Sequence, residues 1–153
     1  MMSVESVKAY FRDNDLPYEV MEFEASTETV ERAAEALGVE PALIAKSLAF
    51  KVKDRAILVV TKGDARIDNQ KFKKQFQAKA KMMSPDEVLE VTGHPVGGVC
   101  PFGLKEPMEI YLDESLKSFE RVYPAAGSRN SCIEIGPQEL ARLTNAPWVD
   151  VCK

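Results

Sequence analysis

The residue types most suited to binding chemistry concentrate in one short stretch, TGHPVGGVCPFG at residues 92–103. It holds four of the eight glycines, two of the nine prolines, the only histidine and one of the three cysteines. Because proline lacks a backbone donor and glycine is entropically costly in a helix, the stretch cannot be helical. The adjacent Gly97 and Gly98 leave room for a ligand to touch main-chain groups. The pattern predicts a rigid binding loop; a plain connection built from turn residues is the alternative.

The same loop offers a second chemistry, because Cys100 and His94 could form a nucleophile and its base. No acidic residue stands nearby to orient the histidine. A buried structural cysteine and a backbone-bonded histidine therefore form the favoured interpretation. The loop lacks the Lys-Ser/Thr ending of a phosphate-binding P-loop and the GxGxxG spacing of a dinucleotide site.

Lys46 is the second chemical candidate, at the start of the strand-like run IAKSLAFKV (residues 44–52). Side chains alternate along a strand, so Lys46 should point with Leu48 and Phe50, away from Lys51. A lysine on the buried side of a strand is either a functional cation or a side chain that extends to water at the strand end.

Composition limits the classes of protein that this chain can be. A length of 153 residues with 45% hydrophobic residues suits one domain, which we expect to span residues 1–153. No apolar run approaches 18 residues and the N-terminus has no signal-like segment, so secretion and membrane insertion are not expected. Three widely spaced cysteines and one histidine support neither a disulfide framework nor a zinc site. We therefore expect a cytoplasmic protein.

The charge is unevenly distributed along the chain. The net charge is −7 over residues 1–45, +8 over residues 46–81 and −5 over residues 82–153, against −4 overall. A basic middle between acidic flanks can attract phosphates, although a solvated lysine-rich surface is the alternative. The candidate phosphate contacts are Lys71, Lys73, Lys74, Lys79 and Lys81.

Hydrophobic periodicity and turn residues predict a mixed α/β fold. Helices are expected at residues 3–15, 29–37, 68–76, 85–91 and 137–143, with a short helical turn that begins at Pro41 and another at 114–119. Strands are expected at residues 18–23, 44–52, 55–61, 108–112, 121–125, 132–135 and 148–152. The strand neighbours are too hairpin-like for a purely parallel sheet, so we expect a single curved mixed sheet flanked by helices.

Four stretches together resemble the YbaK family: AKSLAF (45–50), GGVCPFG (97–103), AGS (126–128) and PQEL (137–140). These proteins are free-standing relatives of the editing domain of bacterial prolyl-tRNA synthetases. The most specific marks are the lysine after the second helix and the G-x-x-x-P element, here Gly97 and Pro101. The resemblance covers essentially the whole chain.

The resemblance implies an aminoacyl-tRNA deacylase, which hydrolyses the ester of a mischarged tRNA, mainly tRNA-Pro carrying a small wrong amino acid. It implies a curved mixed sheet flanked by helices and no metal or organic cofactor. The partners would be the acceptor end of aminoacyl-tRNA and, as a candidate, prolyl-tRNA synthetase. Family members remove alanine, cysteine, or serine and threonine, and no residue of this chain decides among them.

The family's functional residues carry over to matching positions of this chain. The essential lysine falls on Lys46. The resemblance assigns substrate binding to Gly97, Gly98 and Pro101, and the pocket-lining turn to Gly127 and Ser128. Such a site works by positioning water and stabilising charge, because an aminoacyl ester is intrinsically labile. Two alternatives stay open: a non-catalytic module that binds tRNA or a synthetase, and a thiol hydrolase using Cys100 and His94.

Overall fold

The computed structural model describes residues 3–27 and 29–153, and its centre is a long hairpin. Strand β2 (Ile44–Val52) pairs with β3 (Arg55–Lys62) in an unbroken antiparallel register from Ala45 opposite Lys62 to Val52 opposite Arg55. The turn between them contains Lys53, which adopts a positive φ of 57°. A tight hairpin turn needs such a conformation, so the chain makes it here without the usual Asn-Gly pair.

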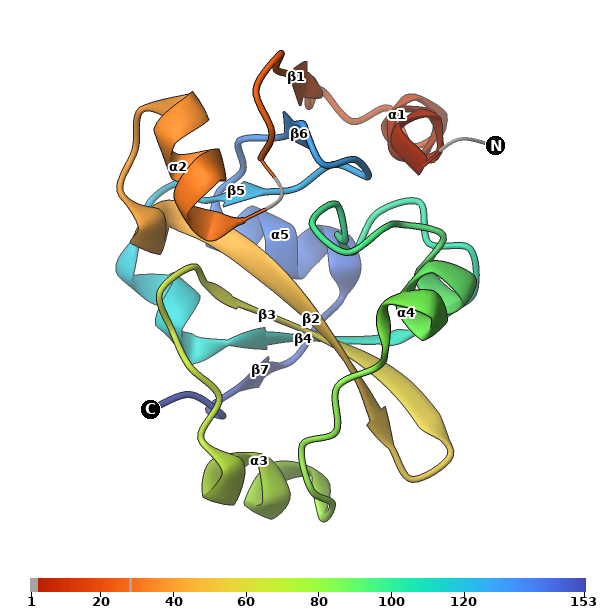
Figure 1. The fold of residues 1–153 in the computed structure, drawn as a ribbon, viewed down its shortest axis with the longest axis vertical. Helices are drawn as coiled ribbons and strands as arrows, with labels where there is room; N and C mark the ends of the chain where they lie inside the picture. Colours follow the sequence, from red (N-terminus) through yellow and green to blue (C-terminus); the bar gives the residue numbers. More distant parts are fainter. Residues whose placement is uncertain (1–2, 28) are drawn as a thin grey trace.

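The hairpin belongs to a five-stranded sheet with the order β5-β2-β3-β4-β7 among the described residues (Figure 1). The remaining strands are β4 (Glu109–Asp113), β5 (Tyr123–Pro124) and β7 (Trp148–Val149). All three join the sheet by parallel pairing. The sheet is therefore mixed, and β3 lies at its centre because its apolar run is buried on both faces.

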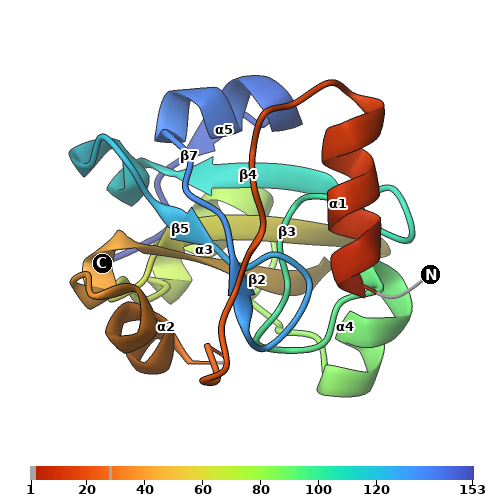
Figure 2. The same cartoon turned by 90° about the horizontal axis from the view of Figure 1, so that it is seen from above.

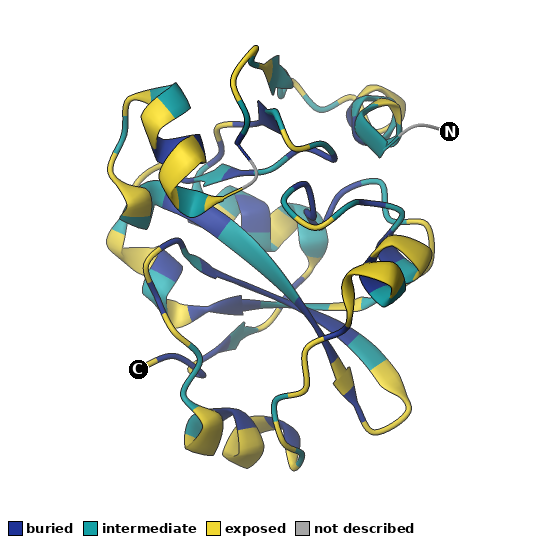
Figure 3. Ribbon diagram, in the orientation of Figure 1, coloured by how far each residue is buried: buried dark blue, intermediate teal, exposed yellow. Residues whose placement is uncertain are grey.

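Helices cover both faces of the sheet (Figures 1 and 2). They are α1 (Ser3–Asp13), α2 (Val30–Leu37), α3 (Asn69–Phe76), α4 (Pro85–Thr92) and α5 (Pro137–Thr144), with the 3₁₀ turns η1 (Pro41–Leu43) and η2 (Glu114–Ser118). One face packs under α1, α5 and the loop at residues 94–103, and α4 covers its hairpin end. The other face packs on α3 and the C-terminal segment. Figure 3 shows the buried residues concentrated along β2, β3 and β4.

The helix ends follow local sequence signals. In α4, Ser84 and Glu87 form a capping box with Pro85 at the first helical position. In α2, the Thr29 hydroxyl accepts from the Arg32 N–H, and Gly38 ends the helix in the left-handed conformation. These signals explain why the predicted helices are found within one or two residues of their predicted ends.

One element of the predicted architecture differs. The strands expected at residues 18–23 and 132–135 contribute β1 (Met21–Glu22) and β6 (Ser131–Cys132), which form a separate two-stranded antiparallel ribbon. The fold is mixed α/β as predicted, but a small ribbon accompanies the main sheet. No helix within residues 3–27 and 29–153 is long and apolar enough to cross a membrane.

Candidate active site

Strand pairing along the outer edge of β2, the edge that faces away from β3, is interrupted in the middle of the strand. Strand β5 pairs with this edge only at Ile44 and Ala45. At the other end the chain near residue 82 covers it, because the Lys51 N–H donates to the Lys81 carbonyl at 2.9 Å and the Met83 N–H donates to the Ala49 carbonyl at 3.0 Å. Between them, residues 46–48 have no strand partner on this edge among the described residues. An unpaired stretch of strand edge presents main-chain hydrogen-bonding groups.

A cavity of about 190 Å³ lies at this gap. Its lining residues come from β2, from α2, from the loop at residues 96–99 and from the chain around β5 and β6, and Figure 1 shows where these segments lie in the fold. Its described lining is Thr27, Thr29, Val30, Ala33, Ile44, Ala45, Lys46, Ser47, Leu48, Val96, Gly97, Val99, Tyr123, Ala125 and Cys132. Lys46 is the one charged side chain in this described lining, so the cavity is mostly apolar with one cation at its wall.

Three segments far apart in the sequence form one wall of the cavity through hydrogen bonds. The Gly127 N–H donates to the Gly98 carbonyl at 2.9 Å, which joins the turn after β5 to the glycine loop. The Arg129 Nε donates to the Val96 carbonyl at 3.1 Å. The Thr27 N–H in turn donates to the Arg129 carbonyl at 2.5 Å. The glycine loop is thereby fixed in place, as a preorganised site requires.

Lys46 lies half-buried on the same face of β2 as Leu48 and Phe50, as the alternation predicts. Its Nζ donates to the Ala65 carbonyl at 2.5 Å. Burial lowers the pKa of Lys46, and the carboxylates of Asp64 and Glu31 act in the opposite direction. An ammonium has three donors, so this anchored group can still donate to a ligand.

The two neighbouring glycines of the loop have different roles. Gly97 lines the cavity, and neither its N–H nor its carbonyl bonds to a described residue. Gly98 is committed to the fold: its N–H donates to the Pro95 carbonyl at 2.8 Å, and a Cβ here would lie 2.7 Å from the Ser128 nitrogen. Gly97 also has a φ of 94°, a conformation that favours glycine whether or not a ligand is bound.

Three of the other sequence candidates stand behind the cavity wall rather than in the lining. Pro101 is buried and does not line the cavity. Gly127 has a φ of 97°, and a Cβ there would lie 2.7 Å from the Ser3 carbonyl oxygen. The Ser128 hydroxyl donates to the Asn130 Oδ1 at 2.8 Å. These residues shape and support the wall, so their contribution to binding is indirect in this geometry.

His94 and Cys100 lie together in the interior, away from the cavity lining. Both are fully buried. The His94 Nε2 bonds the Phe102 carbonyl at 2.8 Å and its Nδ1 bonds the Ser3 hydroxyl, while the Cys100 Sγ lies 3.8 Å from Nε2. Burial raises the pKa of Cys100 to about 12 and lowers the pKa of His94. A thiol so protonated is a poor nucleophile, so the geometry gives the thiol-hydrolase alternative no support.

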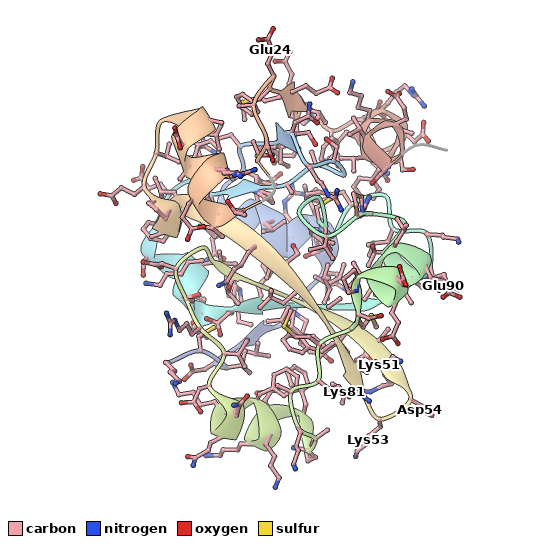
Figure 4. The ribbon with its side chains drawn as sticks, viewed as in Figure 1. Glu24, Lys51, Lys53, Asp54, Lys81 and Glu90 are labelled. Carbon is pink, nitrogen blue, oxygen red and sulfur yellow. The ribbon has the colours of Figure 1, made fainter. Side chains whose placement is uncertain are left out.

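The five candidate phosphate contacts do not share one environment. The Lys71 Nζ donates to the Asp150 Oδ1 at 3.2 Å and to the Cys152 carbonyl at 2.9 Å, which ties α3 to the C-terminal segment. The other four are exposed and make no ion pair with a described residue: Lys73, Lys74, Lys79 and Lys81. Lys81 lies beside Lys51, because its carbonyl accepts from the Lys51 N–H at 2.9 Å. Figure 4 shows both residues toward the turn of the hairpin, where the Lys51 ammonium pairs with Glu87.

Sequence reasoning missed five polar lining residues, which are Thr27, Thr29, Ser47, Tyr123 and Cys132. Ser47 carried a usable signal, because it is a polar residue beside Lys46 within an otherwise apolar strand. Thr27 and Cys132 carried none, since their positions depend on the pairing of β1 with β6 and on the Thr27 N–H bond to the Arg129 carbonyl. In the ranges 3–27 and 29–153, no three His, Cys, Asp or Glu side chains are grouped closely enough to hold a metal ion.

Comparison with known proteins finds relatives that match most of the chain. The model of the aminoacyl-tRNA editing domain family matches residues 24–143. The chain is 53% identical to the uncharacterised protein YwhH of Bacillus subtilis, covering 99% of this chain and 98% of that protein. It is 29% identical to EbsC of Enterococcus faecalis, a candidate Cys-tRNA(Pro)/Cys-tRNA(Cys) deacylase, over 89% of this chain and 85% of the relative. A crystal structure described as a candidate trans-editing enzyme for prolyl-tRNA synthetase superposes with a TM-score of 0.91 at 34% identity, covering 99% and 97% of the two chains.

Proposed function

Since this chain belongs to the aminoacyl-tRNA editing domain family, we propose that it is a trans-editing deacylase for mischarged aminoacyl-tRNA. The proposed substrate is tRNA(Pro) carrying a small wrong amino acid, and one editing domain spans residues 1–153. The observation that carries the proposal is that Lys46 and Gly97 line the same small cavity, and that the Gly97 main chain makes no hydrogen bond within residues 3–27 and 29–153. Both residues come from the stretches that resemble the family.

The proposed reaction is hydrolysis of the aminoacyl ester. Water adds to the ester carbonyl, the bond to the terminal ribose oxygen breaks, and that oxygen takes a proton. The products are the free amino acid and the uncharged tRNA. A strong nucleophile is unnecessary, because positioning and charge stabilisation supply most of what a labile ester requires.

Lys46 supplies the positive charge in this proposal. Its ammonium, held by the Ala65 carbonyl, would stabilise the developing oxyanion or the phosphate of the terminal adenosine. The main-chain N–H and carbonyl of Gly97 would orient the aminoacyl group and the attacking water. A hydroxyl of the terminal ribose can assist that water. Gly98, Pro101, Gly127 and Ser128 hold the wall against which the aminoacyl group rests.

The body of the tRNA would contact the basic middle of the chain. Lys73, Lys74, Lys79 and Lys81 are exposed and can approach phosphates of the acceptor end. Lys71 has a structural bond to Cys152, so we give it a smaller part than its neighbours. Prolyl-tRNA synthetase is a candidate partner, and the cytoplasm is the proposed location because charged tRNA is used there.

A deacylation assay tests this proposal directly. The purified chain is mixed with tRNA(Pro) charged with alanine, cysteine, serine or threonine, and amino acid release is compared with spontaneous hydrolysis. We expect accelerated release from at least one of these four and none from the cognate prolyl-tRNA(Pro). Binding without acceleration of any of them would instead support the non-catalytic module.

A further inference from the structure

Two residues that line the cavity carry side-chain hydroxyls that make no hydrogen bond to a nitrogen or oxygen atom of the described residues. They are the Oγ1 of Thr27 and the Oγ of Ser47, and both atoms are buried. Thr27 as a whole is only 4% exposed. Leaving a buried hydroxyl unpaired costs free energy, and such groups are uncommon in folded proteins. Two of them at the wall of one cavity therefore indicate a ligand that pairs with them.

The two hydroxyls belong to segments of the fold that both line the cavity. Ser47 lies in the middle of β2, where the outer edge of the strand is unpaired, and on the strand face opposite to Lys46. Thr27 follows the ribbon strand β1, and its N–H bond to the Arg129 carbonyl holds it in place. Burial raises the pKa of the Cys132 thiol to about 11, and a hydrogen bond between this thiol and the Thr27 hydroxyl acts in the opposite direction. A neutral thiol is a weak partner, so it leaves the Thr27 hydroxyl available.

The main chain of Ser47 adds to this arrangement. Ala49 and Lys51 direct their main-chain groups to the outer edge, as their bonds to residues 83 and 81 show. Residues two apart on a strand face the same edge, so Ser47 does likewise. The pairing with β5 ends at Ala45, and in the described ranges no main-chain partner meets Ser47 on this side. Around these polar groups the wall is apolar, with Val99, Ala125 and Leu48.

From this arrangement we propose that Thr27 and Ser47 form a subsite for the side-chain hydroxyl of the amino acid, so that the enzyme removes serine or threonine. The inference rests on the proposed function. A hydroxyl both donates and accepts, as does each of the two unpaired groups, so one substrate hydroxyl satisfies both. An alanyl methyl leaves both unpaired, and the thiol of a cysteinyl group pairs with them only weakly.

The same subsite would prevent hydrolysis of correctly charged prolyl-tRNA(Pro). A prolyl side chain is a hydrocarbon ring with no donor or acceptor, so it would bury both hydroxyls without pairing them. Sites that hydrogen-bond a substrate hydroxyl discriminate strongly against analogues that lack it, because their own polar groups are then left unpaired. Thr27 and Ser47 are thus specificity-determining residues, whereas Lys46 and Gly97 serve every substrate.

Deacylation kinetics with four mischarged tRNAs test the subsite. The wild-type chain, Thr27→Val and Ser47→Ala are each assayed with seryl-, threonyl-, alanyl- and cysteinyl-tRNA(Pro). We expect the wild type to hydrolyse seryl- or threonyl-tRNA at least about tenfold faster than alanyl-tRNA, measured as kcat/KM. Each variant should lose about tenfold on the hydroxyl substrates and change by less than about threefold on alanyl-tRNA. Thr144→Val is the matched control, because the Thr144 hydroxyl bonds Leu140 within α5 and lies outside the cavity lining.

A melting experiment without tRNA separates recognition from folding. Replacing an unpaired buried hydroxyl by a methyl should leave the Tm of Thr27→Val equal to or above that of the wild type. The control Thr144→Val removes a partnered hydroxyl and should lower the Tm. A lowered Tm for Thr27→Val would mean that the hydroxyl is structural and would overturn the subsite.

The kinetic outcomes also separate the subsite from the proposed function. Preference for alanyl- or cysteinyl-tRNA, or an equal loss on all four substrates, would overturn the subsite while leaving deacylation intact; the equal loss would assign the hydroxyls to the α-amino group. If the wild type hydrolyses none of the four, the proposed function fails. The subsite is then decided by the affinities of non-hydrolysable amide-linked seryl- and alanyl-adenosine, and it stands only if the seryl analogue binds at least about tenfold tighter.

Discussion

The cavity at the edge of β2 and the buried cluster around His94 contain similarly reactive residue types but differ in what their polar atoms do. In the cluster, both His94 nitrogens are bonded, to Ser3 and Phe102, and Cys100 is enclosed. At the cavity, the main chain of Gly97 and two side-chain hydroxyls make no hydrogen bond to a nitrogen or oxygen atom of the described residues. A polar group that is hydrogen-bonded within the protein stabilises the fold, whereas one without such a bond beside an open cavity is available to bind a ligand. Residue type alone did not distinguish these two regions.

Among the substitutions that test this contrast, Lys46→Ala has the largest expected effect. We expect deacylation to fall by about 10²-fold or more, because a positioned charge at the reacting ester is lost. Lys51→Ala is the control, since Lys51 lies on the same strand but pairs with Glu87. The readouts are kcat/KM and the Tm of each variant. Near-normal turnover by folded Lys46→Ala would show that the cavity is not the catalytic site.

A second test compares a lysine of α3 that bonds within the protein, Lys71, with two exposed lysines of the same helix, Lys73 and Lys74. Replacing both Lys73 and Lys74 by glutamate should weaken tRNA binding about tenfold or more and flatten its salt dependence, because exposed lysines release counterions on meeting phosphates. Lys71→Met should mainly lower the Tm, since the Lys71 ammonium bonds the Cys152 carbonyl. The measurement is tRNA affinity across a salt series. An unchanged salt slope in the double variant would show that these lysines are only a solvated surface.

A smaller effect on activity is expected at Cys100. Cys100→Ala should keep deacylation within about tenfold of the wild type while lowering the free energy of unfolding by roughly 1–3 kcal/mol, because only interior packing changes. In the folded protein the thiol should resist alkylation, since burial holds its pKa near 12. An acyl-thioester trapped on Cys100 during turnover would reverse the roles of the two regions.

The smallest expected effect is a pH dependence of stability from His94. Burial lowers the pKa of His94 in the folded state, so below about pH 6.5 the unfolded chain binds the proton more readily. The His94 contribution to stability is therefore complete above that pH and declines as the pH falls toward the folded-state pKa. The Tm of His94→Gln, measured from pH 8 to 5, should fall less steeply on acidification than that of the wild type. Parallel profiles would contradict a buried neutral histidine, and the deacylation rate should show no inflection near pH 6.5 from this residue.

The helices and strands could be predicted from the sequence because the signals that form and end them lie within a few residues of each element. The capping box at Ser84 and Glu87, the left-handed glycine at Gly38 and the apolar run of β3 each act within a few residues. The position of Lys46 on the face of Leu48 follows from alternation alone. The resemblance of four short stretches was enough to indicate the family, which the match over residues 24–143 shows.

Only the tertiary structure decided which of the candidate residues meet. Thr27 and Ser47 are twenty positions apart and converge because β1 pairs with β6 while β5 leaves the middle of β2 uncovered. Gly97 and Gly98 are adjacent residues of the same type, yet Gly98 packs closely against Ser128, whereas Gly97 lines the cavity. His94 and Cys100 resembled a catalytic pair in the sequence, and packing against α1 made them interior. Burial and hydrogen-bond saturation depend on segments distant in the chain, so no local pattern encodes them.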